Sequence, residues 1–193
     1  MPNIVVNILN VMAKAGVDTH FLVVGTHALY AYETAAGVRI AEQAMATRDV
    51  DMLFDTRKHL AFFTAMEKLD SSLIGLLRKA DASFDVVEDQ HYTARNNDGF
   101  EVDIIRRVAH EQDPHPLRMS NAEDDFWAVQ VSMGDRLASA RRFDQVVVAT
   151  SGEMALMRTV HPLDFARIKR GKDALQAAII KTLVAEYLPH LCE

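Results

Sequence analysis

Residues 46–54 read Ala-Thr-Arg-Asp-Val-Asp-Met-Leu-Phe, in which two aspartates precede an apolar run. The run predicts a strand over residues 49–54, and side chains alternate along a strand. Asp49 and Asp51 are therefore expected on one face, with Val50 on the other. Their Cα atoms would lie about 6.5–7 Å apart, close enough for both carboxylates to bind a common metal site. The same pair could instead be solvent-exposed polarity at a sheet edge, or a cap for the preceding loop.

A second acidic strand is predicted further along the chain. Residues 91–95 and 100–105 are two strand-like runs around an Asn-Asn-Asp-Gly turn at 96–99, a pattern typical of a hairpin. Glu101 and Asp103 would share one face of its second strand. If this strand neighbours residues 49–54, Asp103 completes a cluster of three carboxylates. Such an oxygen-only ligand set favours Mg²⁺ or Mn²⁺ over zinc.

A strand followed abruptly by a helix is predicted upstream of both acidic strands. Residues 21–24 form a short apolar run that ends at Gly25-Thr26, and Thr26 is expected to cap a helix over 27–36. The first turn of a helix offers free backbone N–H groups to phosphate, and glycine lets a ligand approach the backbone closely. An anion site beside metal-binding carboxylates predicts a pocket for a nucleoside triphosphate.

The rest of the chain predicts an α+β fold, a small mixed β-sheet flanked by helices with a helical C-terminal portion. The ends of the late helices are marked by Pro162 at a first helical position, Asp173 at an N-cap and Pro189 as a stop. Everything after Gly152 is expected to be helical. We expect a core over residues 1–150 and a helical extension over 151–193 packed on it. Further helices are predicted over 3–15, 57–69 and 72–80, and a strand over 144–149.

The composition excludes several classes of protein. The 193 residues carry a net charge of -6, which disfavours a dedicated binder of duplex DNA. Cys192 is the only cysteine, so intrachain disulfides and thiolate zinc clusters are ruled out. The chain shows no signal-peptide pattern and no apolar run long enough for a membrane span. We therefore expect a cytoplasmic protein that does not contact a membrane.

The order of these motifs resembles the DNA polymerase β-type nucleotidyltransferase superfamily. That superfamily carries a Gly-Gly or Gly-Ser turn, an Asp-x-Asp strand and a third acidic strand, in the order of Gly25-Thr26, Asp49-Val50-Asp51 and Val102-Asp103 here. Residues 25–33, 46–51 and 99–103 are more closely similar to a largely uncharacterised bacterial group of predicted nucleotidyltransferases. Similarity to that group continues through residues 161–166 and 176–177, so the resemblance covers most of the chain.

The resemblance implies a metal-dependent transfer of a nucleoside monophosphate from a triphosphate to a hydroxyl acceptor. Asp49 and Asp51 would hold two magnesium ions. Asp103 would bind the second ion and help to deprotonate or orient the acceptor, while Gly25 and Thr26 would hold the β- and γ-phosphates. The acceptor could be an RNA end, a protein hydroxyl or a small molecule.

Basic residues near these motifs are candidate phosphate contacts. Arg48 could contact phosphate or merely neutralise the carboxylates. Lys169 and Lys172 could clamp the triphosphate or form a solvated helix end. Relatives in the group carry a longer basic insert between the helix that contains residues 165–169 and the final helix. In this chain Gly171 joins these two helices almost directly. The shorter basic region favours an alternative, a non-catalytic nucleotide-binding module such as one half of a toxin–antitoxin pair.

Overall fold

The computed structural model describes residues 1–45, 47–169 and 174–192, and it has the mixed α+β architecture predicted from the sequence. In the described residues a seven-stranded sheet has the order β1-β2-β5-β4-β3, and β7 extends it beside β5 and pairs with β6. The strands of this sheet are β1 (Phe21–Val24), β2 (Asp49–Phe54), β3 (Asp85–Val87), β4 (Gln90–Arg95), β5 (Glu101–Arg106), β6 (Leu117–Arg118) and β7 (Trp127–Gln130).

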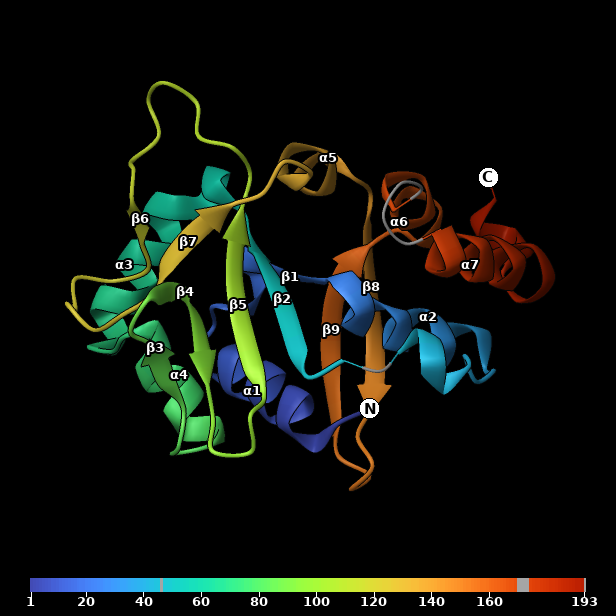
Figure 1. Ribbon diagram of the computed structural model, residues 1–193, viewed down its shortest axis with the longest axis horizontal. Helices are drawn as coiled ribbons and strands as arrows, with labels where there is room; N and C mark the ends of the chain where they lie inside the picture. The colour runs from blue at the N-terminus through green and yellow to red at the C-terminus, as the bar shows by residue number, and fades with distance from the viewer. Residues whose placement is uncertain (46, 170–173, 193) are drawn as a thin grey trace.

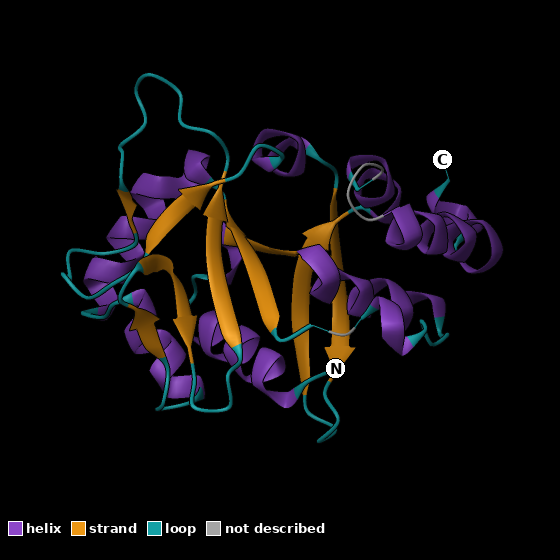
Figure 2. Ribbon diagram, in the orientation of Figure 1, coloured by secondary structure: helices purple, strands orange, loops and turns teal. Residues whose placement is uncertain are grey.

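Helices surround the sheet on several sides (Figures 1 and 2). The helices are α1 (Asn3–Lys14), α2 (Leu29–Ala36), α3 (His59–Leu69), α4 (Leu73–Ala80), α5 (Gly134–Ser139), α6 (Pro162–Ile168) and α7 (Ala174–Tyr187). Helix α1 packs against α4, and α6 packs against α7. The buried side of α1 follows the helical spacing of its apolar residues, which is the reason that this segment was predicted to be helical.

The two acidic strands lie side by side. Strand β2 pairs with β5 in parallel, and the register places Asp49 beside Glu101 and Asp51 beside Asp103. The alternating residues Val50 and Val102 are almost fully buried on the other side of the sheet. Burial of this apolar face favours the register, because a slip of one residue would move Val50 or Val102 to the face that carries the carboxylates.

One predicted helical segment is a strand instead. Strand β9 (Met154–Val160) pairs with β8 (Arg142–Val148) in an antiparallel hairpin, so the expectation that everything after Gly152 is helical was wrong. Along β9 Ala155 and Met157 are buried while Met154 is exposed, which is the two-residue period of a strand. The hairpin crosses residues 150 and 151, and the division of the chain there stays a prediction.

The remaining helical signals agree with the structure where it describes them. Helix α6 begins at Pro162, and α7 ends at Tyr187 shortly before Pro189. Asp173, the predicted N-cap of α7, lies outside the described residues. Among the helices of the described ranges, none is long and apolar enough to cross a membrane.

Candidate active site

Three carboxylates converge on one face of strands β2 and β5. One oxygen atom each from Asp49, Asp51 and Asp103 lies within 4.8 Å of the others, and all three residues are half-buried. The parallel register produces this cluster, because it places Asp51 directly beside Asp103 and two residues from Asp49 on the same face. The convergence predicted from strand alternation is therefore confirmed.

The cluster resists full ionisation. Burial, together with the neighbouring charges of Asp103 and Asp49, raises the pKa of Asp51 to about 6, while the charge of Lys169 opposes them. Burial also raises the pKa of Asp103, with the hydrogen bond from Thr93 acting in the opposite direction. Like charges held together away from water disfavour the charged state. A divalent cation at this position would remove that penalty.

Neighbouring residues hold the carboxylates in place. The hydroxyl of Thr47 donates a hydrogen bond to Asp49 Oδ1, and Thr93 Oγ1 donates to Asp103 Oδ1 at 2.5 Å. Thr93 lies on β4, directly across from Asp103. Counting back from the predicted hairpin turn would have identified Thr93 as the cross-strand partner, although the sequence analysis did not consider it.

His27 holds the backbone of Asp49 in place. Its Nδ1 lies 3.0 Å from the backbone oxygen of Asp49, and its ring packs near the rings of Tyr30 and Phe100. Since a carbonyl oxygen only accepts, Nδ1 carries the proton and donates it. Burial lowers the pKa of His27 to about 4, so the ring is neutral near pH 7. These contacts make His27 a packed, hydrogen-bonded residue that positions Asp49.

Gly25 brings the turn after β1 into contact with the cluster. Its φ is +68°, and a Cβ built on it would collide with Asp51 Oδ2. Only glycine adopts this backbone freely and leaves room for the carboxylate. From the sequence, this space was expected to admit a phosphate, whereas the structure shows the Asp51 carboxylate against the glycine itself.

Thr26 does not cap a helix, contrary to the sequence-based expectation. It lies inside a short 3₁₀ turn over Gly25–Ala28 that precedes α2, and neither segment has a side-chain cap. The hydroxyl oxygen of Thr26 instead accepts a hydrogen bond from Gln176 on α7, at 3.2 Å. Nothing in the local sequence signals this partner, which the sequence analysis missed.

Of the basic candidates, Arg48 lies against a turn, and the ammonium of Lys169 lies over the ring of Phe165, 5.9 Å from its centroid. Arg48 Nη1 lies 3.5 Å from the backbone oxygen of Asp98, beside an open cleft of about 580 Å³. Lys169 follows α6, and its charge partly opposes the rise in the Asp51 pKa that burial and the neighbouring carboxylates cause. Lys172 lies outside the described residues. Within the described ranges, no basic side chain forms an ion pair with the three carboxylates.

Comparison with known proteins identifies the family. A family model described as nucleotidyltransferase matches residues 3–193, nearly the whole chain. The chain belongs to this nucleotidyltransferase family, which supports a transferase that uses a nucleoside triphosphate. Searches of curated proteins and of solved structures found no match.

Proposed function

We propose that this chain is a metal-dependent nucleotidyltransferase that moves a nucleoside monophosphate from a triphosphate to a hydroxyl acceptor. The observation that carries the proposal is the convergence of Asp49, Asp51 and Asp103 in a chain of this family. The proposal includes membership of this chain in the polymerase β-type superfamily and in the bacterial group that its motifs resemble.

The three carboxylates suit a hard divalent cation. Their oxygen atoms form an all-oxygen donor set, which favours Mg²⁺ or Mn²⁺. The raised pKa values of Asp51 and Asp103 mark a site where negative charge lacks compensation. When bound, the metal would neutralise charge on the triphosphate and orient it for in-line displacement.

The chain's own residues would bind the triphosphate and the acceptor. The hydroxyl of Thr26 and the ammonium of Lys169 would face the phosphates, with Lys172 as a further candidate outside the described residues. Asp103 would hold the proton of the acceptor hydroxyl. Arg48 would need to leave the Asp98 carbonyl to reach a phosphate.

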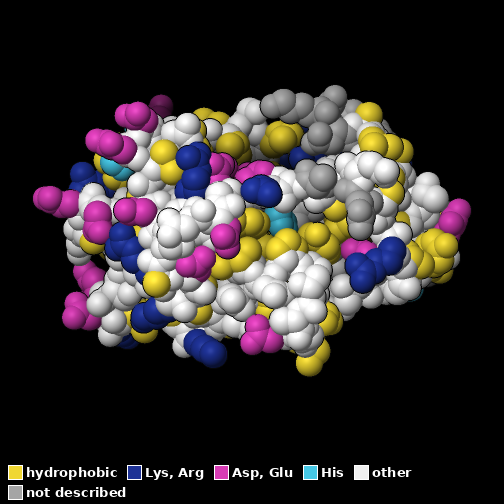
Figure 3. All heavy atoms as spheres, turned by 60° about the horizontal axis from the view of Figure 1, so that its bottom comes forward, with side chains coloured by type: hydrophobic (Ala, Val, Ile, Leu, Met, Phe, Trp, Pro, Cys, Tyr) yellow, Lys and Arg dark blue, Asp and Glu magenta, His cyan; other side chains and the backbone are white. Residues whose placement is uncertain are grey.

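The acceptor stays open among an RNA end, a protein hydroxyl and a small molecule. On the face drawn in Figure 3, basic and acidic side chains are interspersed. Among the described residues drawn there, the basic side chains do not form a continuous track of the kind that follows a nucleic-acid backbone. A compact acceptor fits this face better than a long duplex does.

The proposal is tested by calorimetric titration of each nucleoside triphosphate with Mg²⁺ or Mn²⁺, together with an assay for pyrophosphate release. Wild-type protein is expected to bind only with metal, and Asp103→Asn to lose binding. Asp89→Asn, at an exposed aspartate in the β3–β4 turn, is the matched control and should bind normally. Metal-dependent binding with no turnover on any acceptor class would favour the non-catalytic module instead. No binding at all would reject both functions.

A further inference from the structure

Gln176 joins the C-terminal helix to two segments of the candidate site. It lies in the first turn of α7, and its side-chain nitrogen donates to Thr26 Oγ1 at 3.2 Å and to the backbone oxygen of Ala44 at 3.0 Å. Thr26 neighbours Gly25, which contacts Asp51. One carboxamide thus connects α7, the turn after β1 and the segment that leads into β2.

The carbonyl of Ala44 fixes which way this carboxamide faces. A carbonyl oxygen only accepts hydrogen bonds, so the nitrogen of Gln176 has to face it. Turning the amide over would set two oxygen atoms against each other. The orientation holds even though Gln176 Oε1 is buried and has no hydrogen-bond partner among the described residues.

This orientation determines the direction of the bond to Thr26. Because the second N–H of Gln176 faces the hydroxyl, the oxygen of Thr26 is the acceptor. The hydroxyl proton is then available, and it donates to no acceptor within residues 1–45, 47–169 and 174–192. A donor hydroxyl on the residue after Gly25, which contacts Asp51, is suited to a phosphate oxygen, to which a charge-assisted hydrogen bond is strong.

We propose that Gln176 is a positioning residue that orients the hydroxyl of Thr26 as a hydrogen-bond donor to the triphosphate. This inference rests on the proposed function. It makes α7 part of triphosphate recognition, although α7 contributes no residue to the metal site.

The test is a double-mutant cycle on binding of a magnesium–nucleoside triphosphate, measured by calorimetry. Gln176→Met keeps the length of the side chain and removes the amide, and Thr26→Val keeps the shape and removes the hydroxyl. Each single variant is expected to bind about tenfold more weakly than wild type. The double variant should bind no more weakly than Thr26→Val alone, since both changes remove one interaction. Thr26→Ser should restore binding.

Two controls separate positioning from a merely structural role. Binding of the matching nucleoside monophosphate, which lacks the β- and γ-phosphates, should be the same in wild type and Gln176→Met. Gln145→Met makes the same substitution on β8 and should not alter triphosphate binding. If Gln176→Met does not fold, Gln176→Glu occupies the same space. Its carboxylate would accept a hydrogen bond from the Thr26 hydroxyl, which could then no longer donate to the triphosphate. Triphosphate binding should therefore fall by more than tenfold.

The outcomes distinguish this inference from the proposed function. Multiplicative losses in the double variant, equal losses for monophosphate and triphosphate, or normal binding by Gln176→Glu would overturn the role of Gln176 alone. Failure of wild-type protein to bind any triphosphate with metal would overturn the proposed function and this inference with it.

Discussion

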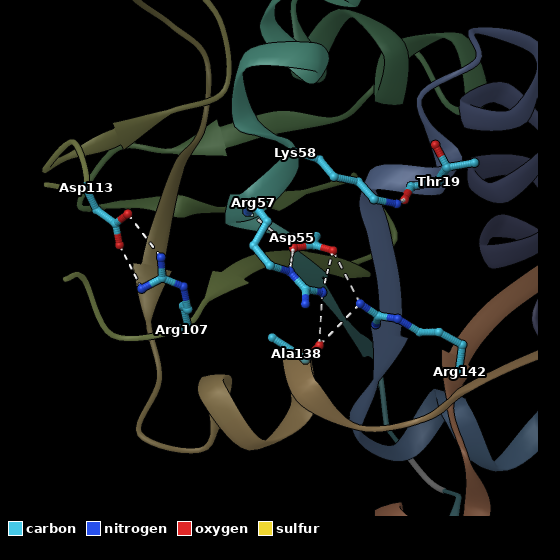
Figure 4. Close-up of polar contacts among 8 residues, drawn as sticks. All are labelled: Thr19, Asp55, Arg57, Lys58, Arg107, Asp113, Ala138 and Arg142. Atoms are coloured by element: carbon cyan, nitrogen blue, oxygen red, sulfur yellow. Dashed lines mark hydrogen bonds and ion pairs between the residues drawn. The ribbon is translucent and has the colours of Figure 1, made fainter.

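Carboxylates lie toward both ends of strand β2, half-buried near its start and buried just past its end, and their pKa values shift in opposite directions. Near the start of β2, Asp51 sits among other carboxylates, and its pKa is raised to about 6. Just past the end of β2, Asp55 is 6% exposed and is bound by Arg57 at 2.8 Å and by Arg142 at 3.3 Å (Figure 4). Burial alone would raise the pKa of Asp55, but these bonds lower it.

The difference separates a carboxylate that supports the fold from carboxylates that we propose bind a cation. Asp55 also accepts from the backbone N–H of Arg57, and both arginines donate to the carbonyl of Ala138. Its charge is fully compensated by the protein. The cluster around Asp51 forms no ion pair with the described basic residues, and the charge of Lys169 offsets only part of its raised pKa, a pattern typical of a site that binds a cation.

The largest expected effect is on ligand binding at the start of β2. Asp51→Asn should reduce metal-dependent triphosphate affinity by at least about 100-fold, because one charged ligand is removed from the metal site. Asp55→Asn, at the other end of the strand, should leave the affinity of the folded protein unchanged. Calorimetric titration of both variants with Mg²⁺ and triphosphate checks this, and equal losses in the two variants would contradict the comparison.

The contact between Gly25 and Asp51 predicts a second, smaller effect. Gly25→Ala should lower the free energy of unfolding by about 3 kcal/mol and displace the carboxylate, so that metal affinity falls as well. Gly37→Ala is the matched control, because Gly37 has a φ of +66° and open space around its Cα. It should cost only about 1 kcal/mol of backbone strain. Denaturant unfolding and metal titration measure both quantities. Equal stability losses with intact metal binding would show that Asp51 gives way freely.

At the other end of β2, removal of a compensated charge should destabilise the fold. Asp55→Asn is expected to lower the free energy of unfolding by about 2 kcal/mol at pH 7, a figure reduced because Arg57 is largely exposed. The pKa of Asp55 is depressed in the folded state, so its stabilisation is present above about pH 4 and is lost as the pH falls further. Urea unfolding of wild type and variant between pH 2.5 and 7 should therefore converge at low pH. A constant difference would assign the loss to packing.

The smallest effect is a pH dependence of opposite sign from Asp51. In the metal-free protein its folded pKa lies above its ordinary value of 3.8, so folding favours the protonated form. The free energy of unfolding should then fall by about 1 kcal/mol as the pH rises from about 4 to about 7. Asp51→Asn should remove this decrease and melt higher than wild type at pH 7 without metal. Thermal melts across this range test the sign, and a lower melting temperature at pH 7 would identify Asp51 as a structural residue.

Much of the site could be predicted from local sequence, because the alternation of side chains along a strand depends only on neighbouring residues. Strand alternation places Asp49 and Asp51 on one face, and it does the same for Glu101 and Asp103. Completion of the cluster by Asp103 was expected only if the two strands are neighbours. The parallel pairing of β2 with β5 meets that condition.

The features that the sequence analysis missed depend on distant partners. Thr26 was expected to cap a helix, but its hydroxyl interacts with Gln176, 150 positions away. Strand β9 was predicted to be helical because a short apolar segment is compatible with either a helix or a strand. Its pairing with β8, which decides for the strand, is a tertiary contact. Arg142 reaches Asp55 from 87 positions away, so the contrast between the two ends of β2 is visible only in the folded chain.

The parallel pairing of β2 with β5 would also tie the proposed metal affinity to completion of the sheet. Asp51 lies on β2 and Asp103 on β5, at opposite ends of the long connection that joins these two parallel strands. During synthesis, a nascent chain that ends before β5 has emerged would hold only two of the three carboxylates. Tight metal binding would begin when β5 closes beside β2, a contact whose loop entropy makes it a late event. Because bound metal stabilises only the closed form, it would favour complete, correctly registered molecules over partly folded ones.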